Sequence, residues 1–381
     1  ITSILVLFSR NLALLFGDEK LATPFMLAGG IIFFASLSNF FNSFFMGLQE
    51  FKYLFLRQSI YEVSRWVIGL PLALTFLAIG ALAGYSIAHL VSFLLLLCFA
   101  FLRYKDYLMG ERSEADRSSR KFIGFMTIAS VSGIIYAYVD SVMIGYFLGS
   151  TFVGFYRASY TIVFAIVGLT SSLATVLFPS FTQMSNREIM FALKKLNKYT
   201  SMIAFPAALG VFYLSKELIT VVYGTDYLYA IPAMMILAFA LIPGAFNYLI
   251  TIFNSKERAD ISASIITASM ILNVVLNYIL ILSMGIAGAA LATVISRFFL
   301  IVSVILLLWK IFGIKTDFSV TLRPIFSSVI MFVILILLPE PRSLFTGVVE
   351  VILVMVIYFG LLFAIGGLKR EDVVYFRSLV R

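Results

Sequence analysis

The sequence predicts an all-α integral membrane protein, and three observations lead to that prediction. Of the 381 residues, 62% are hydrophobic and only 12% are charged, whereas about a quarter of the residues in a soluble domain are charged. The chain divides into about a dozen apolar stretches, and most reach the roughly 20 residues that a helix needs to cross a bilayer. Lys and Arg gather in every second connection between these stretches, as they do in cytoplasmic loops.

Each apolar stretch is expected to form one membrane-spanning helix. The first begins at Ile1 inside an apolar run, so we expect a clipped helix there. Trp309 stands beside Lys310 at a helix boundary, as an interfacial anchor does. The expected spans are 1–16, 23–47, 55–79, 82–102, 122–148, 152–178, 198–222, 229–253, 260–282, 286–309, 322–338 and 344–366.

The basic connections indicate which helix ends face the cytoplasm. The other connections hold only Lys20, Lys216 and Arg342. We therefore expect a multi-pass protein of the cell (inner) membrane whose C-terminus is cytoplasmic. The basic connections are 48–58, 103–121, 179–198, 254–260, 310–323 and the tail 369–381.

The connections on the outer side are short and rich in glycine. Residues 79–84, 148–152 and 283–286 carry almost no charge and leave no room for an external domain. A membrane glycosyltransferase or ligase needs large outer loops with acidic residues, so this pattern argues against an enzyme.

Two sequence patterns recur along the chain and predict an internal repeat. Leu12–Pro24 resembles Leu218–Pro232, and Gly84–Ser92 resembles Gly288–Ser296. The spacing predicts two pseudo-symmetric lobes of about six helices each plus two C-terminal helices, with the first two helices missing and about 12 present. Substrate sites of such repeats lie between the lobes. The expected divisions are an N-lobe at 1–102, a cytoplasmic linker at 103–121, a C-lobe at 122–310, and two C-terminal helices with a cytoplasmic tail at 311–381.

The linker 103–121 is the longest hydrophilic segment, and it mixes both signs of charge. It is either a solvated connection between two helix bundles or a regulatory segment that binds a partner.

Several motifs, in this order and topology, resemble one superfamily of membrane transporters. The chain is similar to the polysaccharide-export, Wzx-like oligosaccharide flippases of the multidrug/oligosaccharidyl-lipid/polysaccharide exporter superfamily. The motifs that carry the resemblance are Asp140–Gly149, Val153–Ala158, Leu177–Pro179, Val221–Tyr227, Asn277 and Gly285–Ala292.

The resemblance implies a transporter with a MATE-like fold. It implies that a lipid-linked oligosaccharide on a polyprenyl pyrophosphate carrier moves from the cytoplasmic to the outer leaflet by alternating access, for cell-surface polysaccharide biosynthesis. Two alternatives from the same superfamily stay open: a cation-coupled multidrug exporter of the MATE type and a peptidoglycan-precursor flippase. An exporter of organic cations would need an acidic, aromatic cavity.

Four arginines lie inside apolar stretches, where a charge is costly and marks a functional candidate. Arg297 lies near the middle of its stretch and is the first candidate for binding an anionic headgroup, followed by Arg10. Arg65 follows Glu62 by three residues, so it either meets substrate or forms a local ion pair. Arg157 lies near the outer boundary, where it either lines the cavity or extends to the interface.

Asp140 is the acidic candidate, because it has no partner at helical spacing on its own helix. It either couples transport to a proton or Na⁺, or forms a salt bridge across the lobes. Glu62 and His89 are secondary candidates for ion coupling, and His89 is otherwise a hydrogen-bonded interior residue. Asn273 and Asn277 share a helix face and are expected to join helices.

The sequence predicts no cofactor and no metal site. The single Cys98 and single His89 exclude cysteine-based clusters and histidine-rich centres, and no Walker motif is present. The net charge of +9 is explained by cytoplasmic loops facing anionic lipids, so nucleic acid is not an expected partner. The expected partners are the lipid-linked oligosaccharide, membrane lipids, and a polysaccharide polymerase or glycosyltransferases, and we expect a monomer.

Overall fold

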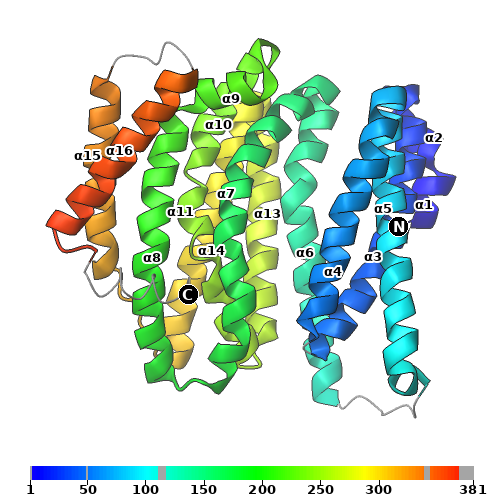
Figure 1. Ribbon diagram of the computed structural model, residues 1–381, viewed down its shortest axis with the longest axis horizontal. Helices are drawn as coiled ribbons and strands as arrows, with labels where there is room; N and C mark the ends of the chain where they lie inside the picture. Colours follow the sequence, from blue (N-terminus) through cyan, green and yellow to red (C-terminus); the bar gives the residue numbers. More distant parts are fainter. Residues whose placement is uncertain (1, 49, 110–116, 339–343, 369–381) are drawn as a thin grey trace. The chain divides into compact units, whose positions relative to one another are not determined.

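The computed structural model describes residues 2–48, 50–109, 117–338 and 344–368 (Figure 1). Throughout these residues the regular structure is helical, with no strand, which confirms the predicted all-α class. Within the part of the chain that the structure describes, seven helices are long and apolar enough to cross a membrane, or eight when one bent pair is counted as a span. The protein is therefore a multi-pass membrane protein. The chain forms two compact units, Ile1–Glu114 and Ala115–Arg381.

The division between the units falls inside the expected linker 103–121. Both ends of that segment are helical, since one helix runs to Met109 and the next begins at Arg117. Residues 110–116, Arg342 and the expected cytoplasmic tail 369–381 lie outside the described residues.

The described residues of the first unit form five α-helices, a short 3-10 helix (Glu19–Leu21) and one π-helical turn. A π-helical turn is rare and is frequent at functional sites; here it lies between α4 and α5. The buried core of the first unit includes Phe41 and Phe45 of α3, Tyr53 of α4 and Leu96 of α5. The elements are α1 (Thr2–Leu7), α2 (Ser9–Leu15), α3 (Ala22–Gly47), α4 (Phe51–Ser64), the π-helical turn Arg65–Gly69 and α5 (Leu70–Met109).

Two sequence expectations for the first unit need correction. The expected span 1–16 is two short helices, because the backbone at Phe8 leaves helical geometry. The break between the spans 55–79 and 82–102 was expected at the glycines of 79–84, but it falls at Leu77, whose φ is 53°. Glycine is nevertheless required just after the break, because a Cβ on Gly80 would lie 1.8 Å from the carbonyl oxygen of Leu72.

The second unit contains the remaining helices. The two turns that were expected on the outer side are very short: Gly149 alone separates α6 from α7, and Gly285 alone separates α13 from α14. Both glycines have positive φ, 98° and 60°, which other residues rarely adopt. The helices are α6 (Arg117–Leu148), α7 (Ser150–Gln183), α8 (Asn186–Tyr213), α9 (Ser215–Tyr223), α10 (Ile231–Ala238), α11 (Leu241–Gly244), α12 (Thr251–Ser255), α13 (Ala259–Met284), α14 (Ile286–Phe312), α15 (Leu322–Leu337) and α16 (Leu344–Ala364).

Two expected spans of the second unit are interrupted. The span 198–222 bends by 74° between α8 and α9. The span 229–253 was expected to be one helix, but it consists of α10, α11 and α12 joined by tight turns. Pro243 and Gly244 lie in its centre and disfavour a continuous helix.

The hairpin of α13 and α14 repeats a detail of the first unit. A Cβ on Gly288 would lie 2.0 Å from the carbonyl oxygen of Leu280, just as one on Gly80 would meet Leu72. In the repeat that the sequence predicts, Gly288 corresponds to Gly84. By local geometry Gly288 corresponds instead to Gly80, which is one helical turn earlier.

The helices α15 and α16 pack against α8. Met202 of α8 lies in one buried cluster with Met331 of α15 and Tyr358 of α16. The Tyr358 hydroxyl also donates to the carbonyl oxygen of Met202 at 3.0 Å. The two C-terminal helices are thus part of the core of the second unit.

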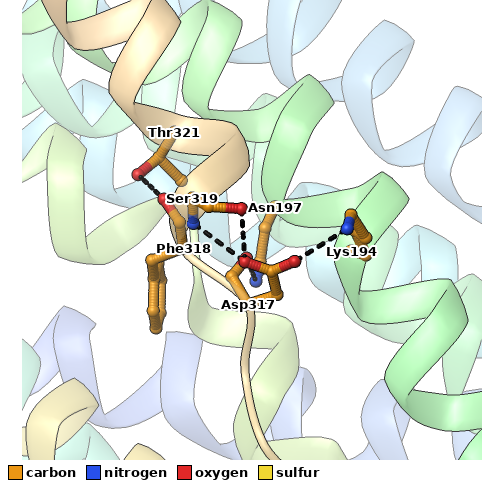
Figure 2. Close-up of polar contacts among 6 residues, drawn as sticks. All are labelled: Lys194, Asn197, Asp317, Phe318, Ser319 and Thr321. Carbon is orange, nitrogen blue, oxygen red and sulfur yellow. Dashed lines mark hydrogen bonds and ion pairs between the residues drawn. The ribbon is translucent and has the colours of Figure 1, made fainter.

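A polar cluster joins α8 to the connection before α15 (Figure 2). The carboxylate of Asp317 lies 2.8 Å from Lys194 Nζ and accepts the backbone N–H and the hydroxyl of Ser319. Asn197, buried on α8, donates to the Asp317 carbonyl oxygen at 3.4 Å and accepts the hydroxyl of Tyr248 at 2.6 Å. The hydrogen bond to Lys194 and those to Ser319 lower the pKa of Asp317 to about 2.

We predict that Gly84→Ala destabilises the protein. A Cβ at Gly84 would lie 2.3 Å from Gly69 Cα, a backbone atom that cannot rotate away. Such overpacking costs about 1–3 kcal/mol, so thermal unfolding in detergent should begin at a lower temperature. Gly47→Ala is the matched control, since nothing lies within 4 Å of its Cβ position. Equal unfolding temperatures for the two variants would contradict the close packing.

We predict that Asp317→Asn has a small effect on stability that depends on pH. Lys194 and Asp317 are 54% and 39% exposed, so the pair contributes about 0.2–1 kcal/mol. Because the folded pKa of about 2 lies below the usual value of roughly 3.9, this contribution is present above about pH 4 and is lost as the pH falls toward 2. Thermal unfolding of both proteins between pH 7 and pH 3 should show the difference shrinking below pH 4; a constant difference would argue against it.

Candidate functional site

Four helices of the second unit place polar side chains in its interior. Tyr136 and Asp140 are four residues apart on α6, as are Asn273 and Asn277 on α13. Side chains at this spacing share a helix face. On α7 and α14 the same rule aligns Tyr156, Tyr160 and Phe164, and Thr293 with Arg297.

Asp140 lies at the centre of this network and is only 1% exposed. It accepts hydrogen bonds from the Tyr156 hydroxyl and, at 2.7 Å, from the backbone N–H of Ser141. The Thr293 hydroxyl lies at 3.5 Å. Among the described residues of the second unit, no Lys or Arg forms an ion pair with Asp140. The carboxyl group is therefore hydrogen-bonded by neutral donors, and Arg157 is close enough to interact with it electrostatically.

Asn273 joins α13 to α14, as the sequence predicted, whereas the bond of Asn277 lies within α13. Asn277 donates to Asn273 Oδ1 at 3.0 Å, and Asn273 donates to Ser296 Oγ of α14 at 3.2 Å. Tyr136 of α6 donates to the same hydroxyl at 2.9 Å. The Oδ1 atom of Asn277 is buried and has no hydrogen-bond partner, so one acceptor of the network is unused.

Arg297 lies against aromatic rings and is only partly buried. Its guanidinium carbon is 4.3 Å from the ring centre of Phe164 and 5.5 Å from that of Tyr136. The ring faces attract the cation. Its Nε atom is buried without a hydrogen-bond partner.

Arg157 has the same kind of surroundings. Its guanidinium carbon is 4.7 Å from the ring centre of Tyr160 and 5.3 Å from that of Tyr138, and its Nη1 atom is buried without a partner. The rings of Tyr160 and Phe164 stack with centres 3.9 Å apart. The aromatic rings of α6 and α7 thus connect the two arginines, and no described carboxylate pairs with either one.

The candidates in the first unit have different partners. Arg65 pairs with Glu62 at 2.7 Å, which is the local ion pair that the sequence offered as one alternative. The His89 ring lies 4.6 Å from that of Tyr61, and its Nδ1 atom is buried without a partner. Arg10 is exposed on α2.

Sequence reasoning missed several residues of these sites. Arg57 was counted with the cytoplasmic connection 48–58, but the structure places it inside α4, partly buried. Tyr138, Tyr160 and Phe164 were not singled out, because aromatic residues make up 16% of the chain and one more gives no signal. The four-residue spacing of aromatic and charged residues on 136–140 and 156–164 could have found them.

A separate polar cavity of about 780 Å³ lies elsewhere in the second unit. It is formed by the start of α6, the end of α7 and the corner between α12 and α13. None of the candidate residues named above lines it. Its charged lining residues are Lys121, Glu257, Arg258 and Asp260.

Comparison with known proteins identifies related sequences. Residues 1–232 match the family model described as polysaccharide biosynthesis protein. The chain is 28% identical over 185 residues to the probable low-salt glycan biosynthesis flippase Agl15 of Haloferax volcanii, a match that covers 47% of this chain and 39% of that protein. It is 25% identical over 190 residues to the lipopolysaccharide biosynthesis protein WzxC of Escherichia coli K12, with 49% and 38% covered. The chain thus matches less than half the length of these relatives.

A solved structure shows the same fold. The whole chain superposes on 81% of the lipid II flippase MurJ in its inward closed conformation, with a TM-score of 0.75 and 17% sequence identity. This likeness confirms the predicted helical membrane fold and, at this identity, carries no further conclusion.

Proposed function

Because the chain belongs to the polysaccharide biosynthesis protein family, we propose that it flips a lipid-linked oligosaccharide from the cytoplasmic to the outer leaflet of the cell membrane. The carrier is a polyprenyl pyrophosphate, and the product supplies cell-surface polysaccharide biosynthesis. Relatives named as glycan flippases support the proposal. The observation that carries it is the pair Arg157 and Arg297, two guanidinium groups with unused donors inside a membrane-spanning unit.

The physical problem of flipping explains why such groups are needed. The lipid tail can remain in hydrocarbon, but the pyrophosphate and the sugars cannot lose their hydrogen bonds without a large cost. A guanidinium group stays charged and binds phosphate oxygens through two parallel hydrogen bonds. Because Arg157 and Arg297 are held by aromatic rings rather than by carboxylates, their charge remains available to an anionic headgroup.

The other arginines have different proposed roles. Arg65 is neutralised by Glu62, so we assign it to positioning rather than to headgroup binding. Arg10 is exposed on α2 and remains a proposed substrate contact. The cytoplasmic C-terminus, the contact with a polymerase or glycosyltransferase, and the monomeric state also belong to this proposal.

Asp140 is the proposed site of ion coupling. It is buried among neutral donors, and the unused Oδ1 atom of Asn277 lies on the neighbouring helix α13. Of the other two candidates, Glu62 already forms an ion pair with Arg65, and His89 lies in the first unit and carries no carboxyl group. Asp140 is therefore the carboxyl group that we assign to binding and releasing a proton or Na⁺. An ion gradient would then drive transport.

We predict that Arg297→Ala lowers flipping at least 10-fold. Losing a charged hydrogen bond costs about 1.5–3 kcal/mol, which corresponds to roughly 10–100-fold in rate. Flipping is measured in proteoliposomes with a fluorescent polyprenyl-pyrophosphoryl N-acetylglucosamine, as the fraction quenched by an impermeant reductant. Arg297→Lys should be intermediate, because it keeps the charge but not the planar fork.

Arg187→Ala is the control for this prediction, since Arg187 is exposed at the start of α8. Wild-type flipping by folded Arg297→Ala would remove the main support for a flippase. Transport of a cationic dye in place of the glycolipid would point instead to a multidrug exporter.

We predict that Asp140→Asn uncouples flipping from an ion gradient. The amide keeps the size of the side chain and can still accept the Tyr156 hydroxyl, but it cannot hold a charge. Imposed proton and Na⁺ gradients are applied to the same proteoliposomes, and one of them should accelerate the wild type but not the variant. Asp226→Asn is the control, because Asp226 is exposed before α10. An unchanged gradient response in Asp140→Asn would rule out this carboxyl group as the coupling site.

A further inference from the structure

The first unit holds a positive charge that its described residues do not neutralise. Arg57 lies near the middle of α4, within the apolar segment Lys52–Lys105. Its Nη2 atom donates to Gln58 Oε1 at 2.8 Å, and its Nη1 atom lies 3.5 Å from Ser38 Oγ. Its Nε atom is buried without a partner. Both of these acceptors are neutral, and Arg57 forms no ion pair with a described carboxylate of the first unit.

The carboxylate on the same helix as Arg57 already has partners. Glu62 is the only acidic residue of α4. One of its oxygens accepts Gln58 Nε2 at 3.2 Å, and the other lies 2.7 Å from Arg65 Nη2. Gln58 therefore stands between Arg57 and Glu62. Of the two arginines on this helical segment, Arg65 has a counter-ion and Arg57 has none.

A second unused nitrogen lies beside Arg57. His89 of α5 packs against Tyr61 with tilted rings whose centres are 4.6 Å apart, and its Nδ1 atom is buried without a partner. Ser92 follows His89 by three residues on α5, so these two side chains share a helix face. Ser38 of α3 and Ser92 of α5, whose hydroxyls are 3.4 Å apart, lie next to the same guanidinium group.

These groups form a site for an anion with several oxygens. Arg57 and Tyr61 are four residues apart on α4, so they share a face, and His89 comes from the helix that packs against it. A guanidinium Nε–H and, in the tautomer protonated on Nδ1, an imidazole N–H both donate hydrogen bonds. An uncompensated cation with two adjacent unused donors matches a phosphate, which brings negative charge and several acceptors.

We propose that Arg57 and His89 bind a lipid-borne phosphate inside the first unit, while Glu62 holds Arg65 apart as a structural residue. The proposal rests on the proposed flippase function and adds a second headgroup site, distinct from Arg157 and Arg297. The ligand is a phosphate ester of a lipid. It comes either from the pyrophosphate of the transported glycolipid or from the phosphodiester of a membrane phospholipid.

The test measures binding of defined lipids to the purified full chain in a non-ionic maltoside detergent. The probe is a fluorescent polyprenyl pyrophosphate without sugar, and the corresponding polyprenol without phosphate reports binding of the tail alone. Arg57→Gln should weaken binding of the pyrophosphate probe at least 10-fold and leave polyprenol binding unchanged. His89→Phe keeps a ring against Tyr61 but removes both nitrogens, and it should weaken the same probe several-fold.

Lys52→Gln is the matched control, since Lys52 is an exposed cation on the same helix, and it should bind both probes as the wild type does. Wild-type affinity for the pyrophosphate probe in folded Arg57→Gln and His89→Phe would overturn the proposal. So would an equal loss of pyrophosphate and polyprenol binding, because the site would then recognise the tail.

Competition with phosphatidylglycerol identifies the source of the phosphate. Displacement of the probe at equal concentration indicates a site for any lipid phosphodiester, and failure to displace it indicates a site for pyrophosphate; both outcomes support a phosphate site. Parallel flipping assays separate this proposal from the proposed function. If Arg297→Ala loses flipping while Arg57→Gln binds and flips normally, only the second site is wrong. If the wild type does not flip the glycolipid, the flippase function fails and the binding result still stands.

Discussion

Hydrocarbon offers no hydrogen bonds, so polar groups within membrane-spanning helices must find their hydrogen-bond partners inside the protein. The described backbone satisfies itself in helices, without strands. Most buried serine, asparagine and tyrosine side chains of the described residues bond to one another or to carbonyl oxygens, as Asn273 and Ser296 do; the Ser327 hydroxyl does not. Against this background, an unpartnered nitrogen on Arg57, Arg157 or Arg297 is an exception. Such exceptions point to a ligand, because leaving a buried donor unused is costly.

The arginines show two ways of holding a cation within a helical membrane unit. Glu62 neutralises Arg65 through an ion pair, which removes its charge from further use. Aromatic rings stabilise Arg157 and Arg297 without neutralising them. The second arrangement keeps the field of the guanidinium group intact. A transporter must release its substrate as well as bind it, and a ring that competes weakly with an anion suits that requirement better than a carboxylate would.

Much of the fold could be predicted from the sequence, because apolar length and the placement of Lys and Arg follow directly from the bilayer. The breaks could not. The positive φ at Leu77 is a conformation that residues other than glycine rarely adopt, and Pro243 with Gly244 interrupts a stretch that is otherwise apolar enough to span. For the site, spacing placed Asn273 and Asn277 on one helix face, and Asn273 does bond to the neighbouring helix α14. Spacing could not place Tyr156 on Asp140, since that contact joins two helices. It also counted Arg57 with the basic connection 48–58, although the expected span 55–79 contains it too.

The turns at Gly149 and Gly285 have a practical consequence. Each joins two long helices through a single residue, so almost no chain projects beyond the helix ends at these points. Proteolytic nicking concentrates at exposed loop tips, and a turn of one residue offers no such loop. Inserted tags or reporter domains would also disrupt the positive φ that closes each turn. Reagents that monitor this protein are better attached away from these two turns.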